Sequence, residues 1–289
     1  MVLFRGLLDD AAIFPPGNAP MSTAVRSHLA WQASTWSAVL GPLICPDTRW
    51  DELLADLPDG GRLAISMTLP GGVGSLPDAL ERAATETRTT LLSLEIPSPA
   101  EGLGRLLELV TEHVPADTRT YVELPWPDVG RSSIDTLARA GVRLKLRTGG
   151  TDAAAFPDER RLATAIQASV AAGVPFKLTA GLHDPIRHRD PHTGFEHHGY
   201  LNVIWATAQA VSGHDLAHIT AALAERNPSR VAEAVAGIDV STATRARQQF
   251  RSFGTCSIAD PVTGLRDLGL LDLGLLDLGL IKEDQWPIG

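Results

Sequence analysis

The segment Ala140-Gly-Val-Arg-Leu-Lys-Leu-Arg-Thr-Gly149 and its counterpart Ala172-Gly-Val-Pro-Phe-Lys-Leu-Thr-Ala-Gly181 decide the fold. Each begins with Ala-Gly-Val, runs through a short apolar stretch that carries one lysine, and ends in glycine. A glycine directly after a helix is typical of the left-handed residue that ends it. Two successive helix–turn–strand units, with a lysine at the same place in each strand, predict a parallel α/β sheet.

Similar apolar segments recur along the whole chain and alternate with helix-like segments. We expect strands at Leu3–Ile13, Ala38–Ile44, Leu63–Thr68, Leu91–Ile96, Thr120–Leu124, Arg143–Leu146, Phe176–Thr179 and Phe250–Gly254. Eight such strands predict a single (β/α)8 barrel, the TIM barrel, over residues 1–289. An open doubly wound sheet is the alternative, but no GxGxxG motif follows the first strand.

Two regions depart from a regular alternation. The interval between the seventh and eighth strands is unusually long, so we expect a helical insertion or lid over the catalytic mouth at residues 183–249. Residues 265–281 contain a pentapeptide repeat of Leu, Gly and Asp whose three units begin at Asp267, Asp272 and Asp277. Three units are too few for a solenoid. We interpret them as a local duplication that packs on the barrel or on a neighbouring subunit, with a dedicated binding element as the alternative.

The composition is typical of a globular protein, with 44% hydrophobic and 20% charged residues and a formal net charge of −9. No basic stripe is present, so we expect no nucleic-acid partner. No apolar run is long enough for a transmembrane helix, and we expect no membrane association. Asp9 and Asp10 interrupt the first apolar stretch, and Cys45 and Cys256 form no CxxC pattern. These features predict a cytoplasmic protein; they leave homo-oligomer formation open.

Polar residues cluster where the predicted strands end, which is where (β/α)8 enzymes place their catalytic groups. Lys145 and Arg147 are two residues apart and therefore lie on one face of their strand, as do Lys177 and Thr179. The other candidates at strand ends are Asp9, Asp10, Glu95, Glu123 and His183. A salt-bridged polar core without catalytic function is the alternative interpretation of this set.

The two lysine strands resemble a known family. Lys145-Leu-Arg-Thr148-Gly149 resembles the K-x-x-T-G strand of the deoxyribose-phosphate aldolase family, and Glu123 on the preceding strand also fits. The segment from Lys177 to His183 is similar to that family's next strand, K-x-x-G-G-[VI]-R, with Ala180 in place of the first glycine and His183 in place of the arginine. The resemblance implies that Lys145 forms a Schiff base and that Lys177 lowers its pKa as a neighbouring cation. It also implies an acid on an earlier strand, for which Glu95 is the candidate by strand number.

The function that we expect is therefore that of an aldolase-like lyase acting on a small polar carbonyl compound, without a cofactor. Lys145 would attack the carbonyl, and the cationic imine would act as an electron sink. Arg147 would hold a carboxylate or another anionic group of the substrate. Asp10, Thr179 and Asn202 are further substrate-binding candidates, and His183 is a candidate general acid–base.

Two alternatives remain open. The segment after the seventh strand is rich in histidine, and imidazoles with carboxylates at this density suit a divalent transition metal such as zinc. In that case the protein would be a metal-dependent hydrolase or isomerase with His183 and His198 as ligands, although no HExxH motif is present. The third possibility is a non-catalytic barrel that serves as a binding or interaction protein, with the C-terminal repeat as its contact surface.

Overall fold

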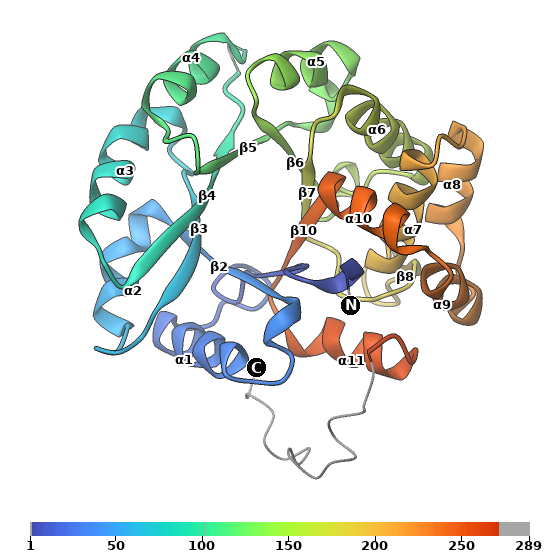
Figure 1. The fold of residues 1–289 in the computed structure, drawn as a ribbon, viewed down its shortest axis with the longest axis horizontal. Coiled ribbons are helices and arrows are strands. Elements are labelled where there is room, and N and C mark those ends of the chain that lie inside the picture. The colour runs from blue at the N-terminus through green and yellow to red at the C-terminus, as the bar shows by residue number, and fades with distance from the viewer. Residues whose placement is uncertain (1, 101, 272–289) are drawn as a thin grey trace.

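The chain forms a closed parallel barrel in the computed structural model, which describes residues 2–100 and 102–271. Around the barrel the strands follow the order β1-β10-β7-β6-β5-β4-β3-β2 (Figure 1). They are β1 (Leu8–Asp10), β2 (Leu40–Pro46), β3 (Leu63–Thr68), β4 (Thr89–Pro97), β5 (Arg119–Glu123), β6 (Arg143–Arg147), β7 (Phe176–Thr179) and β10 (Phe250–Thr255). The predicted (β/α)8 barrel is confirmed.

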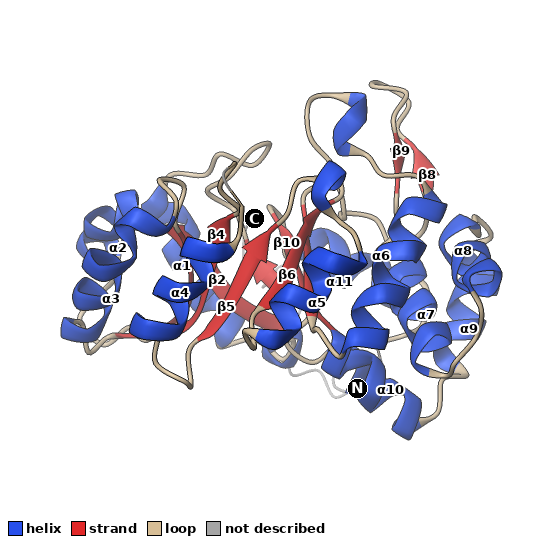
Figure 2. Ribbon diagram, turned by 90° about the horizontal axis from the view of Figure 1, so that it is seen from above, coloured by secondary structure: helices blue, strands red, loops and turns tan. Residues whose placement is uncertain are grey.

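Helices alternate with these strands and surround the barrel (Figures 1 and 2). They are α1 (Met21–Gln32), α2 (Trp50–Asp56), α3 (Leu76–Thr85), α4 (Gly104–His113), α5 (Arg131–Arg139), α6 (Glu159–Ala172), α7 (Tyr200–Val211), α8 (Leu216–Ala224), α9 (Pro228–Ala236), α10 (Val240–Gln249) and α11 (Ala259–Asp267). None of the helices in the described part of the chain is long and apolar enough to cross a membrane.

The alternation of apolar and charged residues along β6 gives the sheet an apolar outer face and a polar inner face. Leu144 and Leu146 are fully buried and belong to the apolar core shared with the helices. Lys145, the residue between them, faces the barrel interior and forms ion pairs with carboxylates from other strands. The interior is therefore polar at this level, and the apolar core lies between the strands and the helices.

The two Ala-Gly-Val turns have the predicted conformation. Gly173 ends α6 with φ 66°, and Gly141 after α5 has φ 67°. Both are in the left-handed region, where a residue with a Cβ is strained. Each turn leads directly into a strand, and the pairing of β6 with β7 sets Lys145 opposite Lys177.

The first predicted strand, Leu3–Ile13, was too long. Val2–Phe4 instead forms a 3-10 helix, η1, and Gly6 turns the chain with φ 57° before β1 begins. Only Leu8–Asp10 pairs with the neighbouring strands β2 and β10. The apolar residues ahead of β1 pack into the core from η1 and the turn, so hydrophobicity alone did not mark the start of the strand.

The predicted segment 183–249 contains helices α7 to α10, but these helices lie along the side of the barrel and not over its mouth. Helices α7 and α8 pack on α6, and α10 packs on η1, which precedes β1 at the amino-terminal end of the barrel. In Figure 2 α10 and the N-terminus lie at the bottom, and the short hairpin of β8 (His188–Arg189) and β9 (Glu196–His197) lies at the top. The helices therefore cover the side of the barrel because their apolar faces join the helical layer. The two repeat units that begin at Asp272 and Asp277 lie outside the described residues.

We predict that Gly173→Ala lowers the free energy of unfolding by about 1 kcal/mol, because the new Cβ is strained at a left-handed φ. Gly104→Ala, in the first turn of α4, is the matched control, since a Cβ there would have no heavy atom within 4 Å. Urea unfolding of both variants measures the difference. An equal effect of the two substitutions would contradict the proposed role of Gly173.

Candidate active site

Glu95 joins the two lysines inside the barrel. Its Oε2 lies 2.7 Å from Lys145 Nζ, and its Oε1 lies 2.6 Å from Lys177 Nζ. The side chain of Glu95 is 1% exposed, so both contacts are shielded from solvent. A buried carboxylate between two ammonium groups satisfies charges that would be very costly if any of them were alone.

Further ion pairs extend this bridge in both directions. Lys145 Nζ also lies 2.8 Å from Glu123 Oε2, and Arg147 Nε lies 3.2 Å from Glu123 Oε1. On the other side, Lys177 Nζ lies 2.5 Å from Asp9 Oδ2. The lysine–carboxylate network thus runs through Asp9, Lys177, Glu95, Lys145, Glu123 and Arg147, which come from strands β1, β4, β5, β6 and β7.

Three serines complete the network. Ser66 on β3 donates to Glu95 Oε1 at 2.6 Å and lies 2.7 Å from the hydroxyl of Ser93 on β4. Ser252 on β10 donates to Asp9 Oδ2 at 2.7 Å. Sequence reasoning missed all three. The available signal was a serine in the middle of each apolar strand, as in Leu63-Ala-Ile-Ser-Met67.

Both lysines are held as ammonium ions. Burial alone would lower the pKa of Lys145, but the carboxylates of Glu95 and Glu123 outweigh burial and raise the pKa above its usual value. At Lys177 burial would likewise lower the pKa, but the carboxylates of Asp9 and Glu95 outweigh burial, so this pKa is also raised. The expected lowering of the Lys145 pKa by Lys177 is therefore wrong, because Glu95 lies between the two ammonium groups and cancels their repulsion.

The acids of the network differ in their affinity for protons. Burial would raise the pKa of Glu95, but Lys145 and Lys177 outweigh it and hold the pKa well below the usual range. The pKa of Glu123 is also lowered, by Lys145 and Arg147 against the effect of burial. At Asp9 burial prevails over the attraction of Lys177 and raises the pKa. Asp9 is therefore the carboxyl group that takes up a proton most readily, and Glu95 is the fixed anion.

Solvent reaches only one end of the network. The side chains of Lys145 and Glu123 are 10% and 23% exposed, and that of Arg147 is 49% exposed. Lys177 is 1% exposed and Asp9 is 4% exposed. A substrate that enters the barrel would consequently meet Arg147, Glu123 and Lys145 first, with Lys177 behind them.

Thr179 and His183 also belong to the carboxyl-terminal mouth. Thr179 pairs in register with Arg147 of β6 and Gly254 of β10. His183 Nδ1 lies 3.8 Å from Cys256 Sγ, a contact between residues distant in sequence. Burial lowers the pKa of His183 and raises that of Cys256, so a neutral imidazole faces a neutral thiol near pH 7. No local pattern predicts this contact, because the two residues are 73 positions apart along the chain.

Asp10, a predicted substrate-binding residue, forms a buried contact with a helix outside the barrel. Its Oδ2 lies 2.9 Å from Nδ1 of His28 on α1, and the side chains are 4% and 0% exposed. Successive residues of a strand point to opposite faces, so Asp10 faces the helical layer while Asp9 faces the barrel interior. Of the two candidate acids of this strand, Asp9 is therefore the one that joins the lysine–carboxylate network.

Asn202 is likewise structural. It is fully buried on α7, where its Oδ1 accepts from the Arg187 backbone N–H at 2.9 Å. Its Nδ2 donates to the carbonyls of Ala222 and Glu225, both at 2.8 Å. Every polar atom of this amide has a protein partner, so none of them points to a substrate in this structure.

The histidines of the segment after β7 contact different partners and do not converge on one point. His198 lies 3.1 Å from Arg187 Nη1 through Nδ1 and 2.9 Å from the Pro157 carbonyl through Nε2, and burial with Arg187 lowers its pKa to about 4. The rings of His188 and His197 stack on each other at 5.1 Å. Among residues 2–100 and 102–271, no three His, Cys, Asp or Glu side chains are grouped as metal ligands. Both ring nitrogens of His198, one of the two predicted metal ligands, are thus in contact with protein groups.

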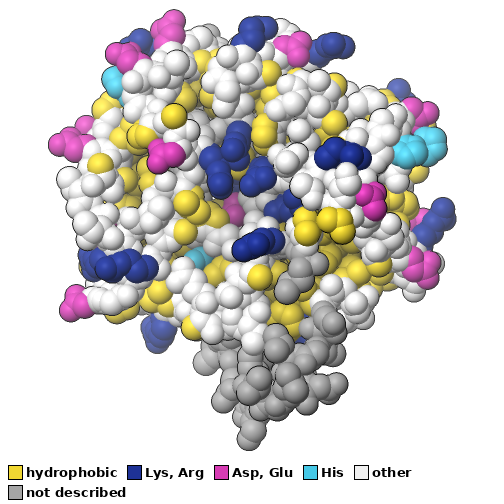
Figure 3. Space-filling model, viewed as in Figure 1, with side chains coloured by type: hydrophobic (Ala, Val, Ile, Leu, Met, Phe, Trp, Pro, Cys, Tyr) yellow, Lys and Arg dark blue, Asp and Glu magenta, His cyan; other side chains and the backbone are white. Residues whose placement is uncertain are grey.

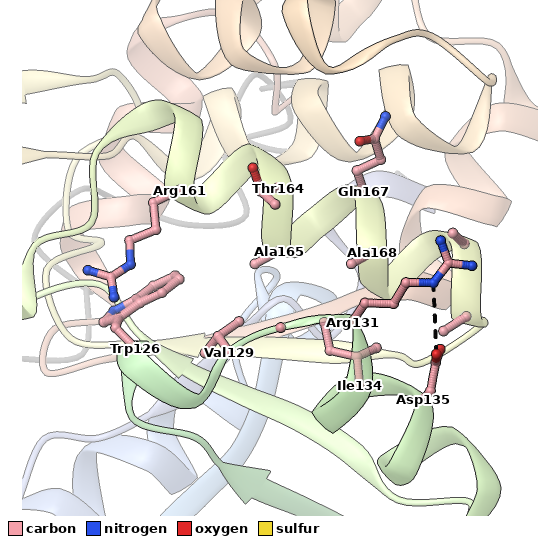
Figure 4. A pocket seen from close by; sticks show the side chains of 13 residues that line it. Trp126, Val129, Arg131, Ile134, Asp135, Arg161, Thr164, Ala165, Gln167 and Ala168 are labelled. Carbon is pink, nitrogen blue, oxygen red and sulfur yellow. Dashed lines mark ion pairs between the residues drawn. The ribbon is translucent and has the colours of Figure 1, made fainter.

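A hollow of about 610 Å³ lies outside the barrel, between α5 and α6 (Figure 4). Arg161 stacks over the ring of Trp126 at 5.3 Å at one end of it. At the other end Arg131 forms an ion pair with Asp135 at 3.8 Å. The floor consists mainly of small side chains of α6, such as Ala165 and Ala168, and the one carboxylate that lines the hollow, Asp135, is paired with Arg131.

Comparisons with models of known protein families and with curated proteins found no match for this chain. The resemblance to the deoxyribose-phosphate aldolase family therefore remains a prediction from the two lysine strands. The chemistry of the site must be argued from its own geometry.

We predict that Glu95→Gln lowers the free energy of unfolding at neutral pH by about 3 kcal/mol or more, because two buried ammonium groups lose their shared anion. The folded-state pKa of Glu95 lies below its ordinary value of 4.5, so its contribution is fully present above that pH and is lost as the pH falls. The difference between wild type and variant should therefore shrink in acid. Urea unfolding as a function of pH measures this.

Glu52→Gln is the control, because Glu52 forms an exposed ion pair with Arg49 at 2.7 Å. It should leave stability unchanged within error. A Glu95→Gln variant as stable as this control would show that the bridge contributes nothing to the fold.

Proposed function

We propose that this protein is an enzyme that acts on a small polar carbonyl compound by forming an imine at Lys145. The observation that carries the proposal is the position of Lys145 Nζ, 2.7 Å from Glu95 and 2.8 Å from Glu123 at the solvent-accessible end of the network. Lys177 has similar partners but is 1% exposed. Of the two buried amines, Lys145 is thus the one that a substrate can approach.

The surrounding carboxylates suit an iminium ion as well as an ammonium ion. Condensation of an ammonium group with a neutral carbonyl compound releases water and gives a protonated imine, so the charge at Nζ stays at +1. Glu95 and Glu123 can therefore stabilise the cation before and after the reaction. The cationic imine can then accept the electron pair of a bond that breaks next to the former carbonyl carbon, which gives a neutral enamine.

Glu123 is the group best placed to move the proton. The amine must lose a proton before it attacks, and Glu123 Oε2 lies within hydrogen-bond reach of Lys145 Nζ at 2.8 Å. Glu123 can return this proton when the carbinolamine loses water. The raised pKa of Lys145 means that only a small fraction is free amine near neutral pH. Imine formation should accordingly accelerate as the pH rises.

Arg147 defines the class of substrate. Its Nε is bonded to Glu123, and about half of its side chain, 49%, is exposed at the mouth. A guanidinium in this position can still donate to a carboxylate or another anionic group of a bound molecule. A small aldehyde, ketone or 2-oxo acid with an anionic substituent fits both Arg147 and Lys145.

The choice of lysine over arginine in this chain supports the proposal. The sequence contains 25 Lys and Arg residues, of which only Lys145, Lys177 and Lys282 are lysines. Arginine therefore supplies nearly all the positive charge, yet two of the three lysines lie inside the barrel. A guanidinium stays protonated in proteins, whereas an ammonium group can release a proton and attack a carbonyl carbon.

Borohydride trapping tests the proposal. The protein is incubated with small aldehydes, ketones and 2-oxo acids, reduced, and mapped by peptide mass spectrometry. We expect a stable mass gain on Lys145 that increases with pH, because deprotonation of Lys145 is the limiting condition. With three lysines in the chain, the modified position is unambiguous.

Lys145→Arg keeps the charge beside Glu95 and Glu123 and should abolish the trapped product. Adducts confined to Lys282 or the α-amino group, or an adduct of equal yield in Lys145→Arg, would refute imine chemistry at this site.

A further inference from the structure

A second charged cluster lies at the opposite end of the barrel. Arg119 is the first residue of β5, Arg143 is the first residue of β6, and Arg251 is the second residue of β10. Arg143 stands two residues before Lys145 and pairs in register with Tyr121, so it faces the same interior one layer lower. We call Arg119, Arg143 and Arg251 the amino-terminal arginine cluster.

Within residues 2–100 and 102–271, none of these three arginines takes part in an ion pair with a carboxylate. Arg143 Nη1 instead donates to the Tyr121 hydroxyl at 3.3 Å, and Arg251 Nη1 donates to the Arg247 carbonyl at 2.9 Å. Burial lowers the pKa of Arg251, and the charges of Arg143 and Arg119 lower it further. The guanidinium groups are thus close enough to repel one another.

Tyr121 separates this cluster from the lysine–carboxylate network. The guanidinium of Arg143 lies over its ring at 5.6 Å, and Lys177 Nζ lies over the ring at 5.4 Å. Figure 3 looks onto the amino-terminal end of the barrel and shows Lys and Arg side chains around a central recess. The recess is therefore open at this end, where positive side chains surround it and an acidic side chain is visible inside it (Figure 3).

A nearby arginine adds to the positive potential. Arg247 is buried at the end of α10 and donates to the backbone carbonyls of Phe250, Arg251 and Arg5. Burial, together with the charge of Arg251, lowers its pKa to about 10. Its partners are neutral carbonyls, so Arg247 holds η1 and β10 together without neutralising the cluster.

The interior acids do not account for the cluster. Asp9, Glu95 and Glu123 are already bonded to Lys177, Lys145 and Arg147. The protein as a whole carries a formal net charge of −9, so this group of guanidinium ions has the opposite sign to the net charge. Like charges gathered in a partly buried recess cost free energy unless an anion binds among them.

We propose that the amino-terminal opening of the barrel binds a small phosphate-type oxyanion, either inorganic phosphate or the phosphate group of a small metabolite, through Arg119, Arg143 and Arg251. Planar guanidinium forks match the geometry and charge of phosphate oxygens. The site is distinct from the site around Lys145, because Tyr121 and Lys177 lie between them. Binding there does not depend on the proposed imine chemistry.

Thermal unfolding and titration calorimetry test this proposal on the full chain. Inorganic phosphate should raise the melting temperature above that in sodium chloride of equal ionic strength, and Arg143→Gln and Arg251→Gln should weaken phosphate binding at least about tenfold. Without phosphate, Arg143→Gln should melt at the same temperature as wild type or higher, because a repulsion is removed. In phosphate this order should reverse.

Arg119→Gln changes an exposed member of the cluster and should weaken phosphate binding in a folded protein. Arg139→Gln, at an exposed position of α5 outside the cluster, is the control and should leave phosphate binding unchanged. Glycerol 3-phosphate as a second probe distinguishes a phosphate monoester from the free ion by which binds more tightly. A melting temperature that responds equally to phosphate and to matched chloride would overturn the proposal. So would full phosphate binding in both Arg143→Gln and Arg251→Gln.

Discussion

The bridge from Lys145 through Glu95 to Lys177 is the interaction on which the rest of the structure depends. It places two positive charges and one negative charge inside a barrel whose outer face is packed with apolar side chains. Such charges are tolerated only when each has several partners. Asp9, Glu123 and the serines at positions 66 and 252 supply them, so that β1, β3, β4, β5, β6, β7 and β10 are joined through one polar network.

The network also makes the two ends of the barrel chemically different. At the carboxyl-terminal mouth, Lys145 is reachable and lies between two carboxylates that can hold a cation and move a proton. At the amino-terminal opening, Arg119, Arg143 and Arg251 form no ion pair with a carboxylate within the described residues. Tyr121 lies between these levels, with Arg143 and Lys177 over its ring. One polar interior thus offers an amine at one end and an anion site at the other.

Much of the fold could be predicted from the sequence, because the apolar strands and the Ala-Gly-Val turns are local features. The same features placed Lys145, Lys177, Glu95 and Glu123 at the level where the structure brings them together. The choice between Asp9 and Asp10 could not be made, since it depends on which face of a three-residue strand points inward.

Other errors have the same origin in contacts that are distant in sequence. Asn202 and His198 look like polar groups that a substrate or metal could use, but backbone groups from remote segments occupy their polar atoms. The pKa of Lys145 was predicted in the wrong direction because two lysines are visible in the sequence as neighbours, whereas the carboxylate between them is not. The arginine cluster could not be predicted from the sequence, because its members lie at the starts of three separate strands.

The ionisation of the two buried lysines tests the bridge most directly. In protein labelled with [ε-13C]lysine, the chain gives at most three lysine side-chain signals, which Lys145→Arg and Lys177→Arg assign. Both buried lysines should remain ammonium ions beyond pH 10.5, the ordinary lysine pKa, and Glu95→Gln should lower both titrations. A buried lysine in the wild-type protein that loses its proton well below pH 10.5 would contradict the charge arrangement described here.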